Sequence, residues 1–424
     1  MAFFLTLVSV ALCYYSPADV VPTLAPYHIQ QYILVPALLS SVGVFLMRRG
    51  GLQAPQWVLM IGFWFAVVMS LIARYLLRAS LSAFMDFGLV VCFYFLVSIN
   101  AFSLTRIGIF CRVIALCMLS MAILGIVAYH TGYLEEKLVM RQMDIDGSLF
   151  SPRIRGYGIL NDPNDFAQLL LVALAFLGVS WRTHNLIVNV IAVFVPAIIL
   201  IYAIYLTGSR GAIFGLVVIA FVTISRRLGK LLSIFLAAML FAVLIGAQFG
   251  GGREISLHES STAGRLVAWG SGISDIKHYP VFGVGYGQFT VYNDQTAHNS
   301  FVLCFAESGL FGYFFWLAMI VTTVLGLEAL ARMPRKTAED IVFARYVITI
   351  RTALYTFLAT SWFLSRTYNP MLYILLALAG VLIYLRRSSF PAVSAPMIRW
   401  VPVTVVAQAT SIVAVYITLR LRGL

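Results

Sequence analysis

The chain has 424 residues, of which 61% are hydrophobic and only 11% carry a charge. Soluble domains carry about 25% charged residues, so this composition excludes a soluble protein and predicts an all-α polytopic membrane protein. In a soluble protein, the net charge of +13 would suggest a nucleic-acid partner. In a membrane protein, orientation and lipid phosphate explain it better, and no nucleic acid is expected.

A hydrocarbon core about 30 Å thick requires roughly 20 apolar residues per helix. Apolar runs of that kind predict a single bundle over residues 1–424 with about 12 transmembrane helices. Either the first or the last run is expected not to cross, because Arg420 and Arg422 would otherwise lie outside. The runs lie near 2–15, 29–47, 56–73, 81–99, 107–129, 165–181, 185–206, 211–225, 231–249, 301–330, 343–364, 369–385 and 400–419.

Basic residues in short loops predict the orientation, because they favour the cytoplasmic side. We take the clusters Arg48-Arg49, Arg226-Arg227 to Lys230, Arg332 to Lys336 and Arg386-Arg387 to face the cytoplasm. Alternation of the helices then places the following segments outside: 16–28, 74–80, 130–164, 207–210, 365–368 and a large loop over 250–300. Arginines are also present at these outer helix ends. Translocation disfavours such residues, so their presence there indicates a function.

The outer stretch 135–170 contains the turn sequence NDPND, in which Asp162 or Asn164 can cap the following helix. A second interpretation is that this helix start and nearby arginines line a pocket for sugar hydroxyls, since a helix N-terminus also offers free amides to anions. Both interpretations stay open for the residues concerned: Arg153, Arg155, Asn161, Asp162, Asn164 and Asp165.

The sequence LTGSRGA places Arg210 between two apolar runs. An arginine at such a position can simply extend its guanidinium to the membrane surface. However, Gly208, Ser209 and Gly211 leave room around it for a bulky phosphate, which favours a binding function.

The large loop contains GRLVAWG, which predicts an amphipathic helix over 264–278 capped by Ser261 or Thr262. We expect this helix to lie on the membrane with Trp269 at the headgroup level and Arg265 in its first turn. A cation there is unfavourable for the helix dipole and therefore indicates an anionic partner. The following GVGYG sequence is interpreted as a tight turn rather than a phosphate loop, because no strand precedes it.

His298 precedes the apolar run 301–330, with Asn299 and Ser300 as candidate caps. A lone histidine is usually structural, but one at a loop–helix junction is suited to proton transfer. Glu307 lies inside the same run, where a carboxylate indicates function or an ion pair with Arg351 or Arg366. No metal-binding, nucleotide-binding or nucleophile-elbow motif occurs, so no metal or cofactor is expected.

Several motifs together resemble the O-antigen ligase and O-antigen polymerase superfamily of bacterial envelope enzymes. They are GILNDPNDFA, LTGSRGA, GRLVAW, PVFGVGYGQF and AHNSFVLCFAESGLFG, and they span about 157–312. The resemblance implies a helical bundle in the inner membrane with its active site facing the periplasm. It also implies metal-independent, inverting transfer of a glycan from undecaprenyl diphosphate to an acceptor hydroxyl, such as that of lipid A–core.

By this resemblance, the catalytic residues are Arg210, Arg265 and His298, which we expect to converge on one outward-facing cavity. Diphosphate gains negative charge as it leaves, and arginines stabilise that charge best. The expected substrate-binding residues are Arg153, Arg155, Asn161, Asp162, Asn164, Asp165, Ser209, Asn299, Glu307 and Arg366.

Three alternatives remain. A polymerase of the same superfamily would use the same chemistry with a different acceptor. A lipid or solute transporter would need charged or broken helices at mid-membrane, for which Asp86 and Glu307 are the main candidates. An inactive scaffold would leave the outward arginines unexplained.

Overall fold

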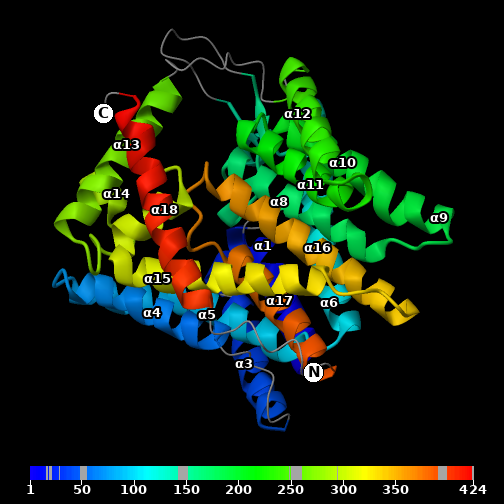
Figure 1. Cartoon of the computed structure of the whole chain (residues 1–424), viewed down its shortest axis with the longest axis horizontal. Coiled ribbons are helices and arrows are strands. Elements are labelled where there is room, and N and C mark those ends of the chain that lie inside the picture. The colour runs from blue at the N-terminus through cyan, green and yellow to red at the C-terminus, as the bar shows by residue number, and fades with distance from the viewer. Residues whose placement is uncertain are drawn as a thin grey trace. The chain divides into compact units, whose positions relative to one another are not determined.

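The protein is described by a computed structural model that covers residues 1–15, 18, 22–27, 29–47, 55–141, 151–247, 249, 260–293, 295–389 and 399–422. The basic clusters Arg48-Arg49 and Arg226-Arg227, as well as the first ten residues of the predicted large loop, lie outside the residues or side chains described. The chain is almost entirely helical (Figure 1).

Each of the 13 predicted apolar runs forms a helix. The longer helices are α1 (Ala2–Tyr14), α3 (Ile29–Met47), α4 (Gln56–Ile72), α5 (Leu77–Asn100), α6 (Leu104–Thr131), α8 (Pro163–Phe176), α10 (Val195–Leu206), α11 (Arg210–Leu228), α12 (Lys230–Gly246), α13 (Ser260–His278), α15 (Ser300–Ala331), α16 (Ala338–Ser361), α17 (Pro370–Ser389) and α18 (Trp400–Arg420). Short elements are α7 (Glu135–Leu138), α9 (Leu186–Asn189) and α14 (Phe289–Tyr292), the 3-10 turns η1 (Pro22–Tyr27), η2 (Gly158–Leu160) and η3 (Leu177–Ser180), and the π-helical turn η4 (Val190–Phe194).

Within the described ranges, eight helices are long and apolar enough to cross a membrane. The other five predicted runs form helices with shorter apolar parts of 10–17 residues: Ala2–Tyr14, Gln56–Ile72, Arg210–Ser225, Leu231–Gly246 and Pro370–Arg386. The fold class is therefore confirmed as an all-α polytopic membrane protein, while the figure of about 12 crossings stays a prediction. One small departure is the antiparallel pair of β1 (Val139–Met140) and β2 (Arg153–Ile154).

The chain forms two compact units, each built from three separate stretches. Unit 1 comprises Met1–Arg49, Ile99–Arg253 and Pro334–Thr360. Unit 2 comprises Gly50–Ser98, Glu254–Met333 and Ser361–Leu424. The prediction of one bundle over the whole chain stays a prediction.

In unit 1, α8 is the central helix and packs against α6, α10 and α11. Eight successive residues of α8, Phe166–Ala173, are buried, which includes the polar side chain of Gln168. Gln168 donates hydrogen bonds from Nε2 to the carbonyl oxygen of Phe357 and to Oγ1 of Thr360, both on α16. This polar contact sets the register of α8 against α16 because a buried amide must be hydrogen-bonded.

In unit 2, α15 is the central helix and packs against α4, α13, α17 and α18. Figure 1 shows α18 running across α15. The helical path of α15 is broken at Gly309, whose φ of 63° and ψ of −170° are not helical. A break inside an apolar helix frees backbone groups that must find other partners.

The loop between α13 and α14 supplies those partners. The N–H groups of Val284 and Gly285 donate to the carbonyl oxygens of Ala306 and Glu307. In the other direction, Leu310 and Phe311 donate to Pro280 and Val281. The predicted tight turn in GVGYG is thus confirmed as a turn, and its backbone also fills the gap in α15.

Glycine is required at this contact. Gly283 has a φ of +71°, and a Cβ there would lie 2.6 Å from the carbonyl oxygen of Glu307. The obstacle is backbone, which cannot move aside as a flexible side chain can.

We therefore expect Gly283→Ala to destabilise the protein by about 1–3 kcal/mol through backbone strain and the clash. Thermal unfolding of the purified protein in detergent measures this. Gly270→Ala is the matched control, because a Cβ at Gly270 on α13 meets nothing within 4 Å. Equal melting temperatures for the two variants would contradict the docking of this loop.

Candidate functional site

The N-terminus of α15 is the best-defined polar junction of unit 2. Asn299 caps the helix, because its Oδ1 accepts hydrogen bonds from the backbone N–H groups of Phe301 and Val302 at 2.9 and 3.2 Å. Asn299 is fully buried. The predicted cap at Asn299 is confirmed, and the cap fixes the point where the polar loop becomes an apolar helix.

Ser300, the first residue of α15, joins this helix to the segment between α16 and α17. Its Oγ donates to the carbonyl oxygen of Leu364 at 2.6 Å and accepts from the backbone N–H of Arg366 at 2.8 Å. The hydroxyl of Thr367 donates to the backbone oxygen of Ser300 at 2.6 Å. The backbone of Arg366, a predicted substrate-binding residue, is thereby held beside the start of α15.

Two contacts bring α13 to the same junction. Nε1 of Trp269 donates to the carbonyl oxygen of Ala297 at 3.0 Å. One turn earlier, a Cβ at Gly264 would lie 2.6 Å from Oε1 of Gln295, so the backbone beside Arg265 lies against the segment that leads into His298. In addition, Thr296 donates a hydrogen bond to Ser365. Unit 2 therefore gathers the backbones of Arg265, His298 and Arg366 around the start of α15.

His298 has an uncommon backbone conformation. Its φ of +46° lies in the left-handed region, which few residues other than glycine adopt. Residues held in such conformations persist only where their surroundings fix them, and they are frequent at functional sites. Here the buried cap at Asn299 and the hydrogen bond to Ala297 fix the chain on both sides of His298, whose side chain is half-buried.

Several predictions about α13 are wrong. The helix begins at Ser260, so Ser261 and Thr262 lie inside it, and Arg265 is in its second turn rather than its first. Trp269 is buried within the protein, on the face of α13 that was expected to lie on the membrane, while its depth relative to the lipid headgroups stays a prediction. The physical reason for the burial of Trp269 is that the apolar face of α13 packs against α15 and α18.

Glu307 lies in α15 and is only 3% exposed. Its Oε1 accepts a hydrogen bond from the backbone N–H of Phe289 at 3.2 Å, which ties the start of α14 to α15. Within the described residues, Glu307 forms no ion pair with Arg366. Arg351, the other predicted partner, belongs to unit 1.

Two tyrosines, Tyr286 and Tyr368, interact with this carboxylate. The rings of Tyr286 and Tyr368 lie 4.5 Å apart, and Tyr368 also contacts Phe63 and Phe87. Burial raises the pKa of Tyr286 to about 12, and the charge of Glu307 acts in the same direction. Tyr286 therefore stays a neutral phenol.

In unit 1, the predicted helix start at NDPND is confirmed. Asp162 caps α8 by accepting from the backbone N–H groups of Asn164 and Asp165 at 2.8 and 3.3 Å. The side chain of Asp165 is 2% exposed, whereas Asn161 is exposed at the surface.

Arg153 connects this helix start to the turn that precedes Arg210. Its Nε donates to the carbonyl oxygen of Thr207 at 2.6 Å, and its Nη2 donates to Oδ1 of Asn164 at 3.1 Å. Gly208 has a φ of +58°, and a Cβ there would lie 3.3 Å from Nε of Arg153. The LTGSRGA and NDPND motifs are thus neighbours in space.

The remaining predicted residues of unit 1 occupy the same region or its edge. Ser209 is buried and is the N-cap residue of α11. Arg210 is the first residue of α11, and its side chain is half-buried. Arg155 is instead turned toward α7, where it donates to the carbonyl oxygens of Lys137 and Glu136 at 3.1 and 2.8 Å. These contacts are structural.

The predicted convergence of Arg210 with Arg265 and His298 stays a prediction, since Arg210 belongs to unit 1 and the other two to unit 2. Sequence reasoning gave Ser300 only a capping role and did not single out Gln295, Thr296 or Ser365. The sequence signal that could have pointed to these residues is their position as polar residues at the ends of apolar runs.

One comparison with known proteins bears on this region. Residues 195–317 match the family model described as O-antigen ligase. This match supports the resemblance to the O-antigen ligase superfamily. The matched O-antigen ligase segment includes Arg210, Arg265 and His298, whereas Arg153 and Arg366 lie outside it. No curated protein matches the chain.

We predict that Arg153→Gln destabilises the protein by about 1–3 kcal/mol, because it removes hydrogen bonds of a charged group to Thr207 and Asn164. Thermal unfolding measures the loss. The exposed Arg182 provides the control, as Arg182→Gln makes the same charge change. If Arg153→Gln and Arg182→Gln unfold at the same temperature, Arg153 does not hold the two motifs together.

We also predict that Ser300→Ala lowers stability by about 1–3 kcal/mol. The change leaves the buried carbonyl oxygen of Leu364 and the half-buried N–H group of Arg366 without their partner. Ser271→Ala is the control, because Oγ of Ser271 bonds only within its own helix, to Val267. A wild-type melting curve for Ser300→Ala would contradict the contribution of these hydrogen bonds to the junction.

Proposed function

We propose that this chain transfers a glycan from undecaprenyl diphosphate to an acceptor hydroxyl, such as that of lipid A–core. The reaction occurs at the periplasmic face of the inner membrane, without a metal and with inversion. The observation that carries the proposal is the junction at the start of α15, where segments bearing Arg265, His298 and Arg366 are hydrogen-bonded together. Two of these residues lie in the segment that matches O-antigen ligase.

The chemistry follows from the residue types. The acceptor oxygen attacks the anomeric carbon of the glycan while the bond from that carbon to the diphosphate oxygen breaks. His298 takes the proton of the acceptor hydroxyl, a contribution worth roughly 10²–10⁴ in rate. The departing undecaprenyl diphosphate gains negative charge, which Arg265 and Arg210 stabilise through paired N–H groups. Diphosphate is a good leaving group and needs no general acid.

The junction suits this role for a second reason. A proton-accepting group must be held in a fixed orientation, because a misplacement of about 1 Å can cost roughly 10²-fold in rate. The buried cap at Asn299 and the left-handed backbone at His298 provide such a fixed position at the boundary between loop and helix.

A polymerase that extends a surface glycan would use the same donor and the same residues. The acceptor decides between the two. Incubating the purified protein and lipid-linked glycan with and without lipid A–core distinguishes them, because a ligase needs the core and a polymerase does not.

A lipid transporter is the second candidate from another class, because α15 is broken at Gly309 next to the buried Glu307. Transporters use broken helices to bind substrate with the freed backbone groups. In this protein those groups bond to the loop 280–285 instead, so the break is closed by the chain itself. This favours the transferase.

We predict that Arg265→Lys lowers the transfer rate by about 10²-fold while the protein still inserts, because an ammonium cannot replace a planar, two-pronged donor. The rate is measured with purified protein, lipid-linked glycan and acceptor in detergent. Arg78→Lys is the control, since Arg78 is exposed in the same unit.

Wild-type transfer by Arg265→Lys would remove this residue from the mechanism. Movement of labelled donor across vesicles by His298→Ala, with transfer lost, would show that the protein carries out transport in addition. If the wild type moves donor, and His298→Ala folds normally but loses both movement and transfer, the transporter would be favoured.

A further inference from the structure

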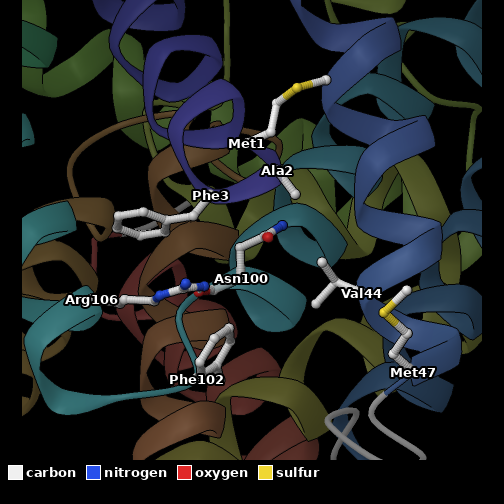
Figure 2. A pocket seen from close by; sticks show the side chains of 8 residues that line it. All are labelled: Met1, Ala2, Phe3, Val44, Met47, Asn100, Phe102 and Arg106. Carbon is white, nitrogen blue, oxygen red and sulfur yellow. The ribbon is translucent and has the colours of Figure 1, made fainter.

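Unit 1 contains a cavity that takes no part in the proposed transfer. It has a volume of about 240 Å³. Its lining residues lie at the start of α1, at the end of α3, and from the end of α5 to the start of α6. Figure 2 shows these side chains: Met1, Ala2, Phe3, Val44, Met47, Asn100, Phe102 and Arg106. All but two of them are apolar.

Arg106 provides the charge of this cavity. Its guanidinium lies over the ring of Phe102 at 3.8 Å and over the ring of Phe3 at 4.6 Å from the ring centres. Its Nη1 donates to the carbonyl oxygen of Asn100 at 3.2 Å. Stacking and this hydrogen bond hold the guanidinium in one orientation beside the cavity (Figure 2).

Asn100 keeps the cavity wall rigid. The side chain is fully buried, and its Nδ2 donates to Oγ1 of Thr6 on α1 and to Oγ of Ser41 on α3, at 3.1 and 2.8 Å. One amide therefore links the end of α5 to two other helices. A wall fixed in this way is formed before any ligand arrives, which lowers the entropy cost of binding.

The electrostatics at this position favour an anion. Arg106 lies in the first turn of α6, where a cation is unfavourable for the helix dipole and an anion is favoured. A bound anion would be attracted both by the guanidinium and by the positive end of a 28-residue helix.

The other walls favour a hydrocarbon chain. Ala2, Val44 and the two methionines present carbon and sulfur atoms, and methionine adapts its shape to irregular apolar ligands. Met1 and Met47 are 91% and 87% exposed, so the cavity opens to the outside between them. α3, α5 and α6 all qualify as membrane spans, and the cavity lies at their ends, where lipid headgroups are found.

We propose that this cavity binds an anionic phospholipid, with the phosphate on Arg106 and the start of an acyl chain along Val44 and Met47. The sequence-based orientation puts this end of α3 and α6 at the cytoplasmic leaflet, where basic pockets between helices recognise anionic lipids. The site is separate from the glycan-transfer residues, because none of them lines it.

The test is a titration of the purified full chain in a neutral detergent, followed by native mass spectrometry. We expect phosphatidylglycerol to bind at least tenfold more tightly than phosphatidylcholine. Inorganic phosphate at millimolar concentration should not displace it. Displacement by inorganic phosphate would show a free-phosphate site and overturn the lipid assignment.

Two variants test the two halves of the cavity. Arg106→Gln should weaken phosphatidylglycerol binding roughly tenfold or more, as expected for loss of a charge-assisted hydrogen bond. Val44→Phe retains the guanidinium but fills the apolar part, and it should weaken binding as well. Because Val44→Phe leaves the Arg106 contacts intact, it keeps the test valid if Arg106→Gln does not fold.

Arg112→Gln is the matched control, because Arg112 lies on the same helix and does not line the cavity. It should bind phosphatidylglycerol as the wild type does. Unchanged binding in both Arg106→Gln and Val44→Phe, or equal loss in Arg112→Gln, would overturn the proposal.

Discussion

The hydrogen bonds of Ser300 and Asn299 are the interaction on which the rest of the site depends. In a chain with 11% charged residues, a polar loop that enters an apolar helix exposes several backbone N–H groups at one point. Asn299 satisfies two of them with its side chain, and Ser300 connects the same point to the backbone of Leu364 and Arg366. The polar groups that secure the helix end therefore also hold the residues proposed to act on the glycan donor.

The same requirement to satisfy backbone groups explains the glycine-rich loop. The break in α15 at Gly309 would leave amides and carbonyls unpaired inside an apolar segment. The loop 280–285 pairs with them, and this close approach of two backbones is possible because Gly283 and Gly309 have no side chain. Glu307 adds a hydrogen bond to Phe289 just beyond the loop. Together these contacts connect α13, α14 and α15 into one support for the loop that ends at His298.

In unit 1, a charged side chain satisfies the backbone groups at a helix end. Arg153 satisfies the carbonyl oxygen of Thr207 at the end of α10 and also holds Asn164 at the start of α8. Arg153, which is predicted to bind substrate, therefore also brings two motifs together. At the other end of the unit, Asn100 and Arg106 organise the cavity in a comparable way.

The sequence predicted the helices well because hydrophobic run length depends only on local composition. All 13 runs became helices, and the caps at Asp162 and Asn299 were found because capping involves neighbouring residues. What it could not predict was partners that are distant in the chain. Ser300 meets Leu364 and Trp269 meets Ala297 across long stretches, and neither pair leaves a pattern in one sequence. The incorrect prediction for the apolar face of α13 has this origin, since an amphipathic face looks the same whether it packs on lipid or on another helix.

The central claim is that Arg265 and His298 act on one substrate at the junction of α13 with α15. A double-mutant cycle on the transfer rate tests it most directly, using Arg265→Lys, His298→Ala and the combined variant. Residues that act as a unit are strongly non-additive, so the account predicts that the combined variant is within about threefold of the slower single variant. A combined loss equal to the product of the two single losses would contradict it.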